Sequence, residues 1–163
     1  MAKDPVHRND EQTSTEKPPI KVFRHRNPLQ ALGAATLFLS QVEPFSQYRF
    51  GAWVDTLKGQ ILRQHYFFSG INDQIVGYYG WALAAHEAAA AWIDNRRELT
   101  YEECLDGPCV LIMANRALSR RVLHHQAATM RALQATREVA YWKRQTPQGT
   151  RLVSFDLQAP GAT

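Results

Sequence analysis

Four arginines in the second half of the chain are the side chains whose type and spacing most clearly suggest chemistry. They are Arg116, Arg120, Arg121 and Arg131, and no acidic residue occurs between Gly107 and Arg137. A guanidinium group holds phosphate or carboxylate through two parallel hydrogen bonds. With a net charge of +4 over 163 residues, this basic segment predicts an acidic partner: nucleic acid, an anionic lipid or an acidic protein.

Two cysteines and a histidine–glutamate pair are the other candidates for chemistry. Cys104 and Cys109 flank Gly107-Pro108. Because the chain has no further cysteine, we expect both to be reduced, with neither a disulfide nor a metal site. His86 and Glu87 follow an apolar segment directly, and they would either face a cleft there or cap a helix.

A strand over residues 74–84 is the element that must position these groups. Its residues alternate, so that Tyr79 and Trp81 share one face, and neither face is polar. This pattern is typical of an interior strand. Gly77 and Gly80 are unusual in such a strand, where glycine marks a bulge or a close approach to the backbone. The sequence therefore predicts either a bulged core strand or one wall of a ligand cleft.

The remaining periodicities predict an α/β domain with the order α-α-β-β-α-β-α-β-β. We expect helices or strands, in chain order, over residues 27–43, 50–62, 65–69, 74–84, 86–95, 108–114, 116–134, 138–144 and 151–157. Residues 98–107 would form a connecting loop, and Thr146-Pro-Gln-Gly149 would turn the last hairpin. The helices would flank a mixed sheet.

The two ends of the chain differ from this domain in composition. Residues 1–26 are polar and rich in proline, so we expect a disordered tail, followed by a domain over 27–157 and a short tail over 158–163. No apolar run approaches the length of a membrane span, and the N-terminus is too polar for a signal peptide. The sequence therefore predicts a cytoplasmic protein without a transmembrane segment.

Two short motifs give the chain a resemblance to a known family. The motifs are Asn27-Pro-Leu-x-x-Leu-Gly33 and Val76-Gly-Tyr78-x-x-Trp81-Ala82. They resemble the RTX toxin-activating lysine acyltransferases, the haemolysin-activating family, and the resemblance extends over residues 27–157. It implies a GNAT-like fold and the transfer of a fatty acyl group from acyl carrier protein to the ε-amine of a protein lysine. The implied partners are acyl carrier protein and an acceptor such as an RTX protein, with a homodimer as a further option and no bound cofactor.

The resemblance also implies which residues form the site. The family uses a histidine between its first two helices and an aspartate on a later strand, and here Ser46 and Leu111 or Ile112 stand at those places. We therefore name Ser46 and His86 as the catalytic candidates. Tyr79 and Trp81 would line the acyl or lysine tunnel, while Arg116, Arg120 and Arg121 would bind the donor. Residues 115–119 contain no glycine, which favours a carrier-protein donor over coenzyme A.

Two other classes of function stay open from the sequence alone. Because the family's histidine and aspartate are replaced, the chain could be a catalytically degenerate member that binds acyl carrier protein or another protein as a regulator. A basic module that associates with nucleic acid or a membrane is the third hypothesis. No nucleic-acid recognition motif accompanies the arginines, so we expect no nucleic-acid partner.

Overall fold

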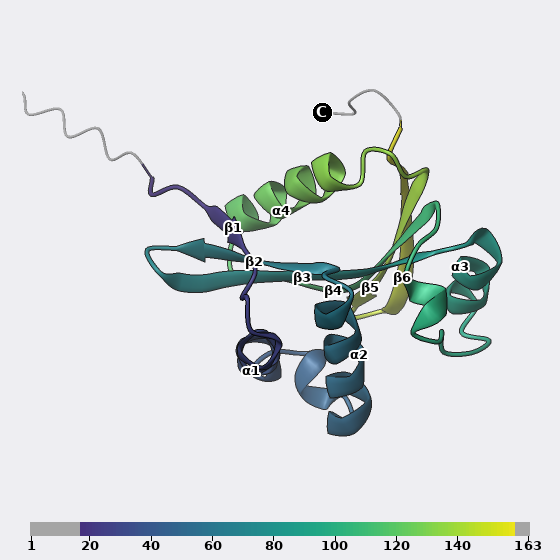
Figure 1. The fold of residues 1–163 in the computed structure, drawn as a ribbon, viewed down its shortest axis with the longest axis horizontal. Helices are drawn as coiled ribbons and strands as arrows, with labels where there is room; N and C mark the ends of the chain where they lie inside the picture. Colours follow the sequence, from purple (N-terminus) through teal and green to yellow (C-terminus); the bar gives the residue numbers. More distant parts are fainter. Residues whose placement is uncertain (1–16, 159–163) are drawn as a thin grey trace, which may run out of the picture.

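A six-stranded mixed sheet forms the centre of the molecule in the computed structural model, which describes residues 17–158 (Figure 1). The strands lie side by side in chain order, and every neighbouring pair is antiparallel except β4 and β5, which are parallel. Their bounds are β1 Lys21–Phe23, β2 Tyr66–Ile71, β3 Gln74–Ala84, β4 Cys109–Ala117, β5 Val139–Thr146 and β6 Gly149–Asp156. The predicted mixed α/β architecture is confirmed.

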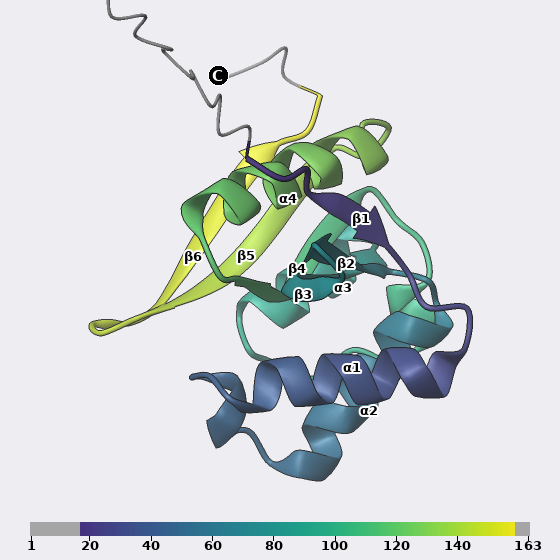
Figure 2. The same cartoon turned by 90° about the vertical axis from the view of Figure 1, so that its left-hand side faces the viewer.

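Helices cover both faces of this sheet (Figures 1 and 2). One face carries α1 and α2, and the other carries α4. Their bounds are α1 Pro28–Ser40, α2 Phe50–Leu62, α3 His86–Ile93 and α4 Arg120–Leu133, with short 3₁₀ turns η1 Phe45–Gln47 and η2 Glu102–Cys104. In the described part of the chain, no helix is long and apolar enough to cross a membrane.

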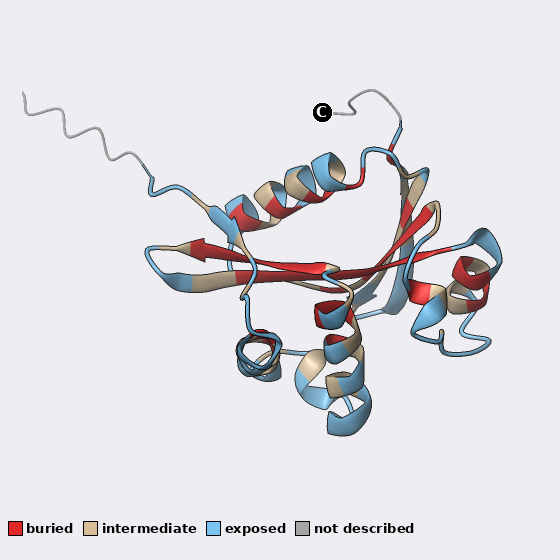
Figure 3. Cartoon of the chain, viewed as in Figure 1, coloured by how far each residue is buried: buried red, intermediate tan, exposed pale blue. Residues whose placement is uncertain are grey.

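The central strands are buried in continuous runs, as expected for a sheet covered on both faces (Figure 3). Tyr78 packs with α1 and α2, whereas Tyr79 and Trp81 pack in the cluster that contains Met130 of α4. Alanines of α3 close a third cluster against the ends of β3 and β4. The α4 contribution to the core is small, since only Val122, Gln126 and Met130 of this helix are buried.

The two glycines of β3 are contact points for buried glutamines on opposite faces of the sheet. An added Cβ at Gly80 would lie 2.1 Å from Oε1 of Gln60 on α2, and one at Gly77 would lie 2.4 Å from Nε2 of Gln126 on α4. The β3–β4 register also shifts between Gly80 and Trp81. The predicted bulge and close backbone approach are therefore both present.

The first strand is a correction to the sequence prediction. Residues 21–23 belong to the segment expected to be disordered, yet they form β1 and pair with residues 68–70 of β2. Phe23 stacks on Phe68 with ring centroids 5.5 Å apart, so an aromatic contact secures the strand. The rest of the predicted N-terminal tail up to residue 16, and residues 159–163 of the C-terminal tail, lie outside the described residues.

The start of the basic helix is a second correction. Residues 115–117 continue β4 instead of opening a helix, and α4 begins at Arg120. Ser119 is the N-cap, because its hydroxyl oxygen accepts a hydrogen bond from the Val122 amide at 3.2 Å. Arg116 is thus a strand residue opposite Tyr78.

Candidate functional site

The parallel strands β4 and β5 separate part-way along their length. Their pairing runs from Cys109 and Val139 to Ile112 and Trp142 and ends there. Beyond this point β4 continues to Ala117 paired with β3, and β5 continues to Thr146 paired with β6. The facing edges of the two strands therefore carry backbone N–H and C=O groups without a strand partner. Such groups can form hydrogen bonds with a ligand or with an added strand.

A cleft of about 680 Å³ lies at this separation. It is bounded by the length of α2, by the chain from α3 to η2, and by β4 and β5. The lining residues that matter for chemistry are Tyr48, Arg49, Trp53, Asp55, Arg63, Trp92, Glu98, Leu99, Tyr101, Cys104, Ile112, Met113 and Lys143. Large pockets that combine apolar walls with a few polar groups are the usual binding sites of proteins.

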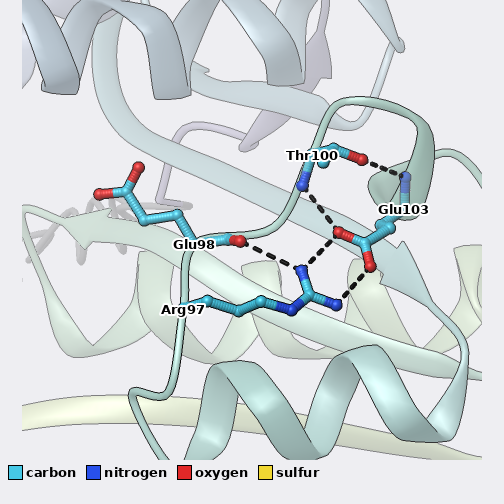
Figure 4. Close-up of polar contacts among 4 residues, drawn as sticks. All are labelled: Arg97, Glu98, Thr100 and Glu103. Carbon is cyan, nitrogen blue, oxygen red and sulfur yellow. Dashed lines mark hydrogen bonds and ion pairs between the residues drawn. The ribbon is translucent and has the colours of Figure 1, made fainter.

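One wall of the cleft is fixed by an arginine–glutamate pair (Figure 4). Arg97 donates to both carboxylate oxygens of Glu103, at 2.7 and 2.5 Å, and the Thr100 amide donates to the same carboxylate at 2.9 Å. The hydrogen bond and charge of Arg97, followed by the Thr100 amide, lower the pKa of Glu103 to about 2. These contacts hold the backbone of Glu98 to Tyr101 at the edge of the cleft.

A lysine from β5 contacts the end of α3 beside the cleft. The Lys143 ammonium lies over the Trp92 ring, 4.3 Å from its centroid, and donates to Asn95 Oδ1 at 2.6 Å and to the carbonyl oxygen of Trp92. Partial burial lowers the pKa of Lys143 below its usual value. A cation and an aromatic ring therefore stand at the point where the strands separate.

Aromatic residues from the loop between α1 and α2 form the outer part of the cleft. Trp53 stacks on Phe45 at 5.2 Å between ring centroids, and Tyr48 lies 5.1 Å from the same indole. Burial raises the pKa of the Tyr48 phenol, so the phenol is protonated at neutral pH. Ser46, the catalytic candidate from this loop, is exposed and does not line the cleft; Tyr48 and Arg49 do.

The predicted tunnel residues lie in the core. Tyr79 is 4% and Trp81 2% exposed, and neither lines the cleft. Trp81 stacks on His65 at 5.9 Å and packs beside Phe67. Burial raises the pKa of Tyr79, and its phenol is bonded to Asn115. The cleft is thus lined by aromatic residues other than the two that the sequence analysis selected.

The predicted donor-binding arginines lie on two different elements. Arg116 is half-buried in β4, and its carbonyl oxygen accepts a hydrogen bond from Gln126 at 3.2 Å. Arg120 and Arg121 are exposed in the first turn of α4, and Arg121 donates to the carbonyl oxygen of Pro18 at 2.7 Å. Because α4 starts just after β4 ends, these two arginines follow the end of β4 closely.

The second catalytic candidate, His86, lies at the other end of these strands. It is the first residue of α3, and its ring contacts Cys109 and Glu138, not the cleft. No group of three or more histidine, cysteine, aspartate and glutamate side chains between residues 17 and 158 is placed to hold a metal ion.

Comparison with solved structures establishes the fold. The loading GNATL domain of CurA from Lyngbya majuscula superposes with a TM-score of 0.58 over 80% of this chain and 68% of that chain, at 15% sequence identity. The fold is GNAT-like. No protein-family model matches the sequence, and no curated protein is detectably similar to it. The relationship to the toxin-activating family therefore stays a prediction from the two motifs.

In this GNAT-like framework, the cleft supplies three chemical capacities. Trp53, Trp92, Leu99, Ile112 and Met113 form apolar walls, Asp55 and Glu98 are carboxylates that can accept a proton, and Tyr48 and Tyr101 are phenols that can donate one. Sequence reasoning missed most of these residues. From the sequence, Trp53 is predicted to lie on the core face of an amphipathic helix, and residues 98–107 are predicted to form a polar connecting loop. Only the structure shows that both segments line the cleft beside the separated strands.

Proposed function

We propose that the protein is an acyltransferase that moves a fatty acyl group from the thioester of acyl carrier protein to the ε-amine of a protein lysine. The observation that carries this proposal is the separation of β4 and β5 beside an apolar cleft. An extended pantetheine arm contains amide groups, and these can pair with the free backbone groups of the separated strands as an added strand would. The acyl chain would then lie against the aromatic walls.

Acyl carrier protein is acidic, and the exposed arginines at the start of α4 can attract it. Arg120 and Arg121 are exposed in the first turn of α4, where the helix N-terminus itself favours a phosphate group. The connection between β4 and α4 consists of Leu118 and Ser119 and has no glycine-rich loop to surround a pyrophosphate. This favours the single phosphate of a carrier-bound pantetheine over coenzyme A.

The chemical step needs a base, an acid and a donor to the thioester oxygen. A free lysine has a pKa near ~10.4, so its ammonium must lose a proton before it attacks. Asp55 or Glu98 would accept that proton, and Tyr48 or Tyr101 would protonate the departing thiolate. The free N–H groups of β4 beyond Ile112 would donate to the oxyanion that forms on the carbonyl.

The test is transfer of label from acyl carrier protein to a lysine-rich acceptor, measured by mass spectrometry for several acyl lengths. Asp55→Asn and Glu98→Gln are compared with the wild type, and loss of the true base is expected to slow transfer by ~10²–10⁴. Arg120→Glu is expected to weaken carrier binding, with the remaining binding less sensitive to salt. Absence of transfer at every acyl length would refute the proposal.

A second candidate function is a regulator that binds acyl carrier protein without turnover. It is favoured by one observation: the residues that line the cleft include no histidine, whereas the family that the sequence resembles uses one. Salt-sensitive binding of the carrier together with no acylated acceptor would select this function.

A further inference from the structure

A cysteine, a histidine and a glutamate form a continuous hydrogen-bonded chain at the end of the sheet away from the separated strands. Nδ1 of His86 lies 3.3 Å from Sγ of Cys109, and Nε2 of the same ring lies 3.0 Å from Oε2 of Glu138. The imidazole stands between a thiol and a carboxylate. This order of groups is the one in which a base activates a nucleophile and a third group orients the base.

The protonation of this chain follows from its geometry. An ionised carboxylate only accepts hydrogen bonds, so Nε2 of His86 must donate to Glu138. In the neutral ring Nδ1 is then the acceptor, and it faces the thiol. Burial, with a smaller contribution from the charge of Glu138, raises the pKa of the Cys109 thiol. The thiol is therefore protonated at neutral pH, and it can donate its hydrogen to Nδ1 of His86.

Three adjacent strand ends hold these groups in place. Ala84 at the end of β3, Cys109 at the start of β4 and Val139 at the start of β5 are consecutive partners in the sheet. His86 follows β3 directly as the first residue of α3. Glu138 precedes β5, and its amide donates to the carbonyl oxygen of Pro108 at 2.9 Å. The arrangement is therefore built on paired backbone, where side-chain positions are most precise.

We propose that Cys109, His86 and Glu138 form a second reactive site, at which Cys109 accepts an acyl group from a thioester. His86 Nδ1 removes the thiol proton while sulfur attacks the thioester carbonyl carbon. The bond from that carbon to the leaving sulfur breaks, and the leaving thiolate takes the proton from the imidazolium. The products are S-acyl-Cys109 and a free thiol, without any oxidant or further reactant.

The imidazole is the exposed neighbour of the sulfur. Cys109 itself is fully buried, whereas the side chain of His86 is 62% exposed. Rotation of an exposed side chain takes picoseconds to nanoseconds, so the ring can move aside without unfolding. A hollow of about 490 Å³ lies on the far side of Glu138, between the start of β5 and the end of β6, and neither Cys109 nor His86 lines it.

The experiment uses S-acetyl-N-acetylcysteamine, a small thioester, with the full-length protein. Cysteine peptides are mapped by mass spectrometry over time, with loss of the adduct on hydroxylamine treatment as proof of a thioester. Cys104 is the internal control: it lines the cleft and its thiol has a raised pKa, but it has no imidazole contact among the described residues. We expect acetylation at Cys109 and little at Cys104.

Replacement of the histidine distinguishes activation from shielding. His86→Ala removes both the base and the cover of the thiol. If His86 acts as the base, acetylation of Cys109 should fall by ~10²-fold or more in this variant. If His86 only covers the thiol, acetylation should rise. His86 is exposed, so the variant is expected to fold. A rise, or equal acetylation of both cysteines in the wild type, would overturn the proposal.

Glu138 is a positioning residue, and its test is a pH profile. Burial and, to a smaller extent, the charge of Glu138 raise the pKa of the Cys109 thiol, so Glu138→Gln is expected to move the midpoint of the rate–pH curve to lower pH. Loss of the contact with the His86 ring is expected to slow the reaction. Glu138→Asp is expected to restore part of both. An unchanged midpoint would remove Glu138 from the site. Because the small thioester needs neither the cleft nor a carrier, these outcomes are independent of the proposed lysine acylation.

Discussion

Replacement of Gly80 by alanine tests how α2 is attached to the sheet and, with it, how the cleft keeps its shape. An added Cβ would lie 2.1 Å from Oε1 and 2.6 Å from Cδ of Gln60. Gln60 is fully buried, and its Oε1 accepts a hydrogen bond from the Tyr78 hydroxyl at 2.7 Å. The glutamine has no free space to enter, so Gly80→Ala must move α2 or break this bond.

The cost can be worked from these contacts. Loss of the buried Tyr78–Gln60 bond costs about 1–3 kcal/mol, and overpacking costs about 1–3 kcal/mol more. The substitution also stabilises the folded state by about 0.5–1 kcal/mol, because glycine loses more backbone freedom on folding than alanine does. The net free energy of unfolding should fall by roughly 3 kcal/mol, which corresponds to a melting temperature lower by roughly 6–12 °C.

Urea unfolding of four proteins measures this effect: the wild type, Gly80→Ala, Gln60→Ala and the double variant. Gly80→Ala should cost little in the Gln60→Ala background, because the clash is gone, giving a coupling of about 2–3 kcal/mol. Gly33→Ala is the matched control, since nothing lies within 4 Å of its added Cβ and α1 should gain about 0.5–1 kcal/mol. Equal costs of Gly80→Ala in both backgrounds would refute the reasoning.

Two further predictions concern the chain between β3 and β4. Gly107 has φ of +151°, and its Cβ would lie 2.1 Å from the carbonyl carbon of Ala84, so Gly107→Ala should lower the free energy of unfolding by more than about 4 kcal/mol in a urea titration. Gly149→Ala, also at positive φ but in open space, should cost only about 1–2 kcal/mol, and equal costs would contradict the clash. Arg97 lowers the pKa of Glu103 from 4.5 to about 2, so the ionised carboxylate stabilises the fold above pH 4.5 and this contribution is lost as the pH falls through 2. Amide exchange of Thr100, corrected for its intrinsic rate, should therefore quicken across that range in the wild type and lose this pH dependence in Glu103→Gln; the same dependence in both would disprove the role of the pair.

Most of the fold follows from local patterns in the sequence. Asn27-Pro28 predicts the start of α1, and Asn27 Oδ1 does accept hydrogen bonds from the Leu29 and Gln30 amides. The alternation over residues 74–84 predicts β3 with its observed bounds. Such elements are predictable because caps and period-two burial depend on residues close in sequence.

Features set by distant partners could not be predicted in the same way. The segment Lys21-Val-Phe23 is too short to signal a strand, and only the Phe68 ring and the free edge of β2 make it one. The surroundings of the catalytic candidates depend on distant partners too, and their roles stay predictions. The resemblance selects Ser46 from its place between the first two helices, but in the structure Ser46 is exposed in η1 and Tyr48 lines the cleft.

The separation of β4 and β5 explains why the end of β4 is predicted from the sequence to begin a helix. Residues 115–117 follow an apolar run and contain Asn115 and Arg116, so their polarity suggests the beginning of the basic helix. In the structure they are still strand, paired with β3 only. Beyond the point where β5 departs, residues 115–117 are only partly buried, so polar side chains are tolerated there. The same departure that misled the helix assignment creates the unpaired edge on which the proposed acyl transfer depends.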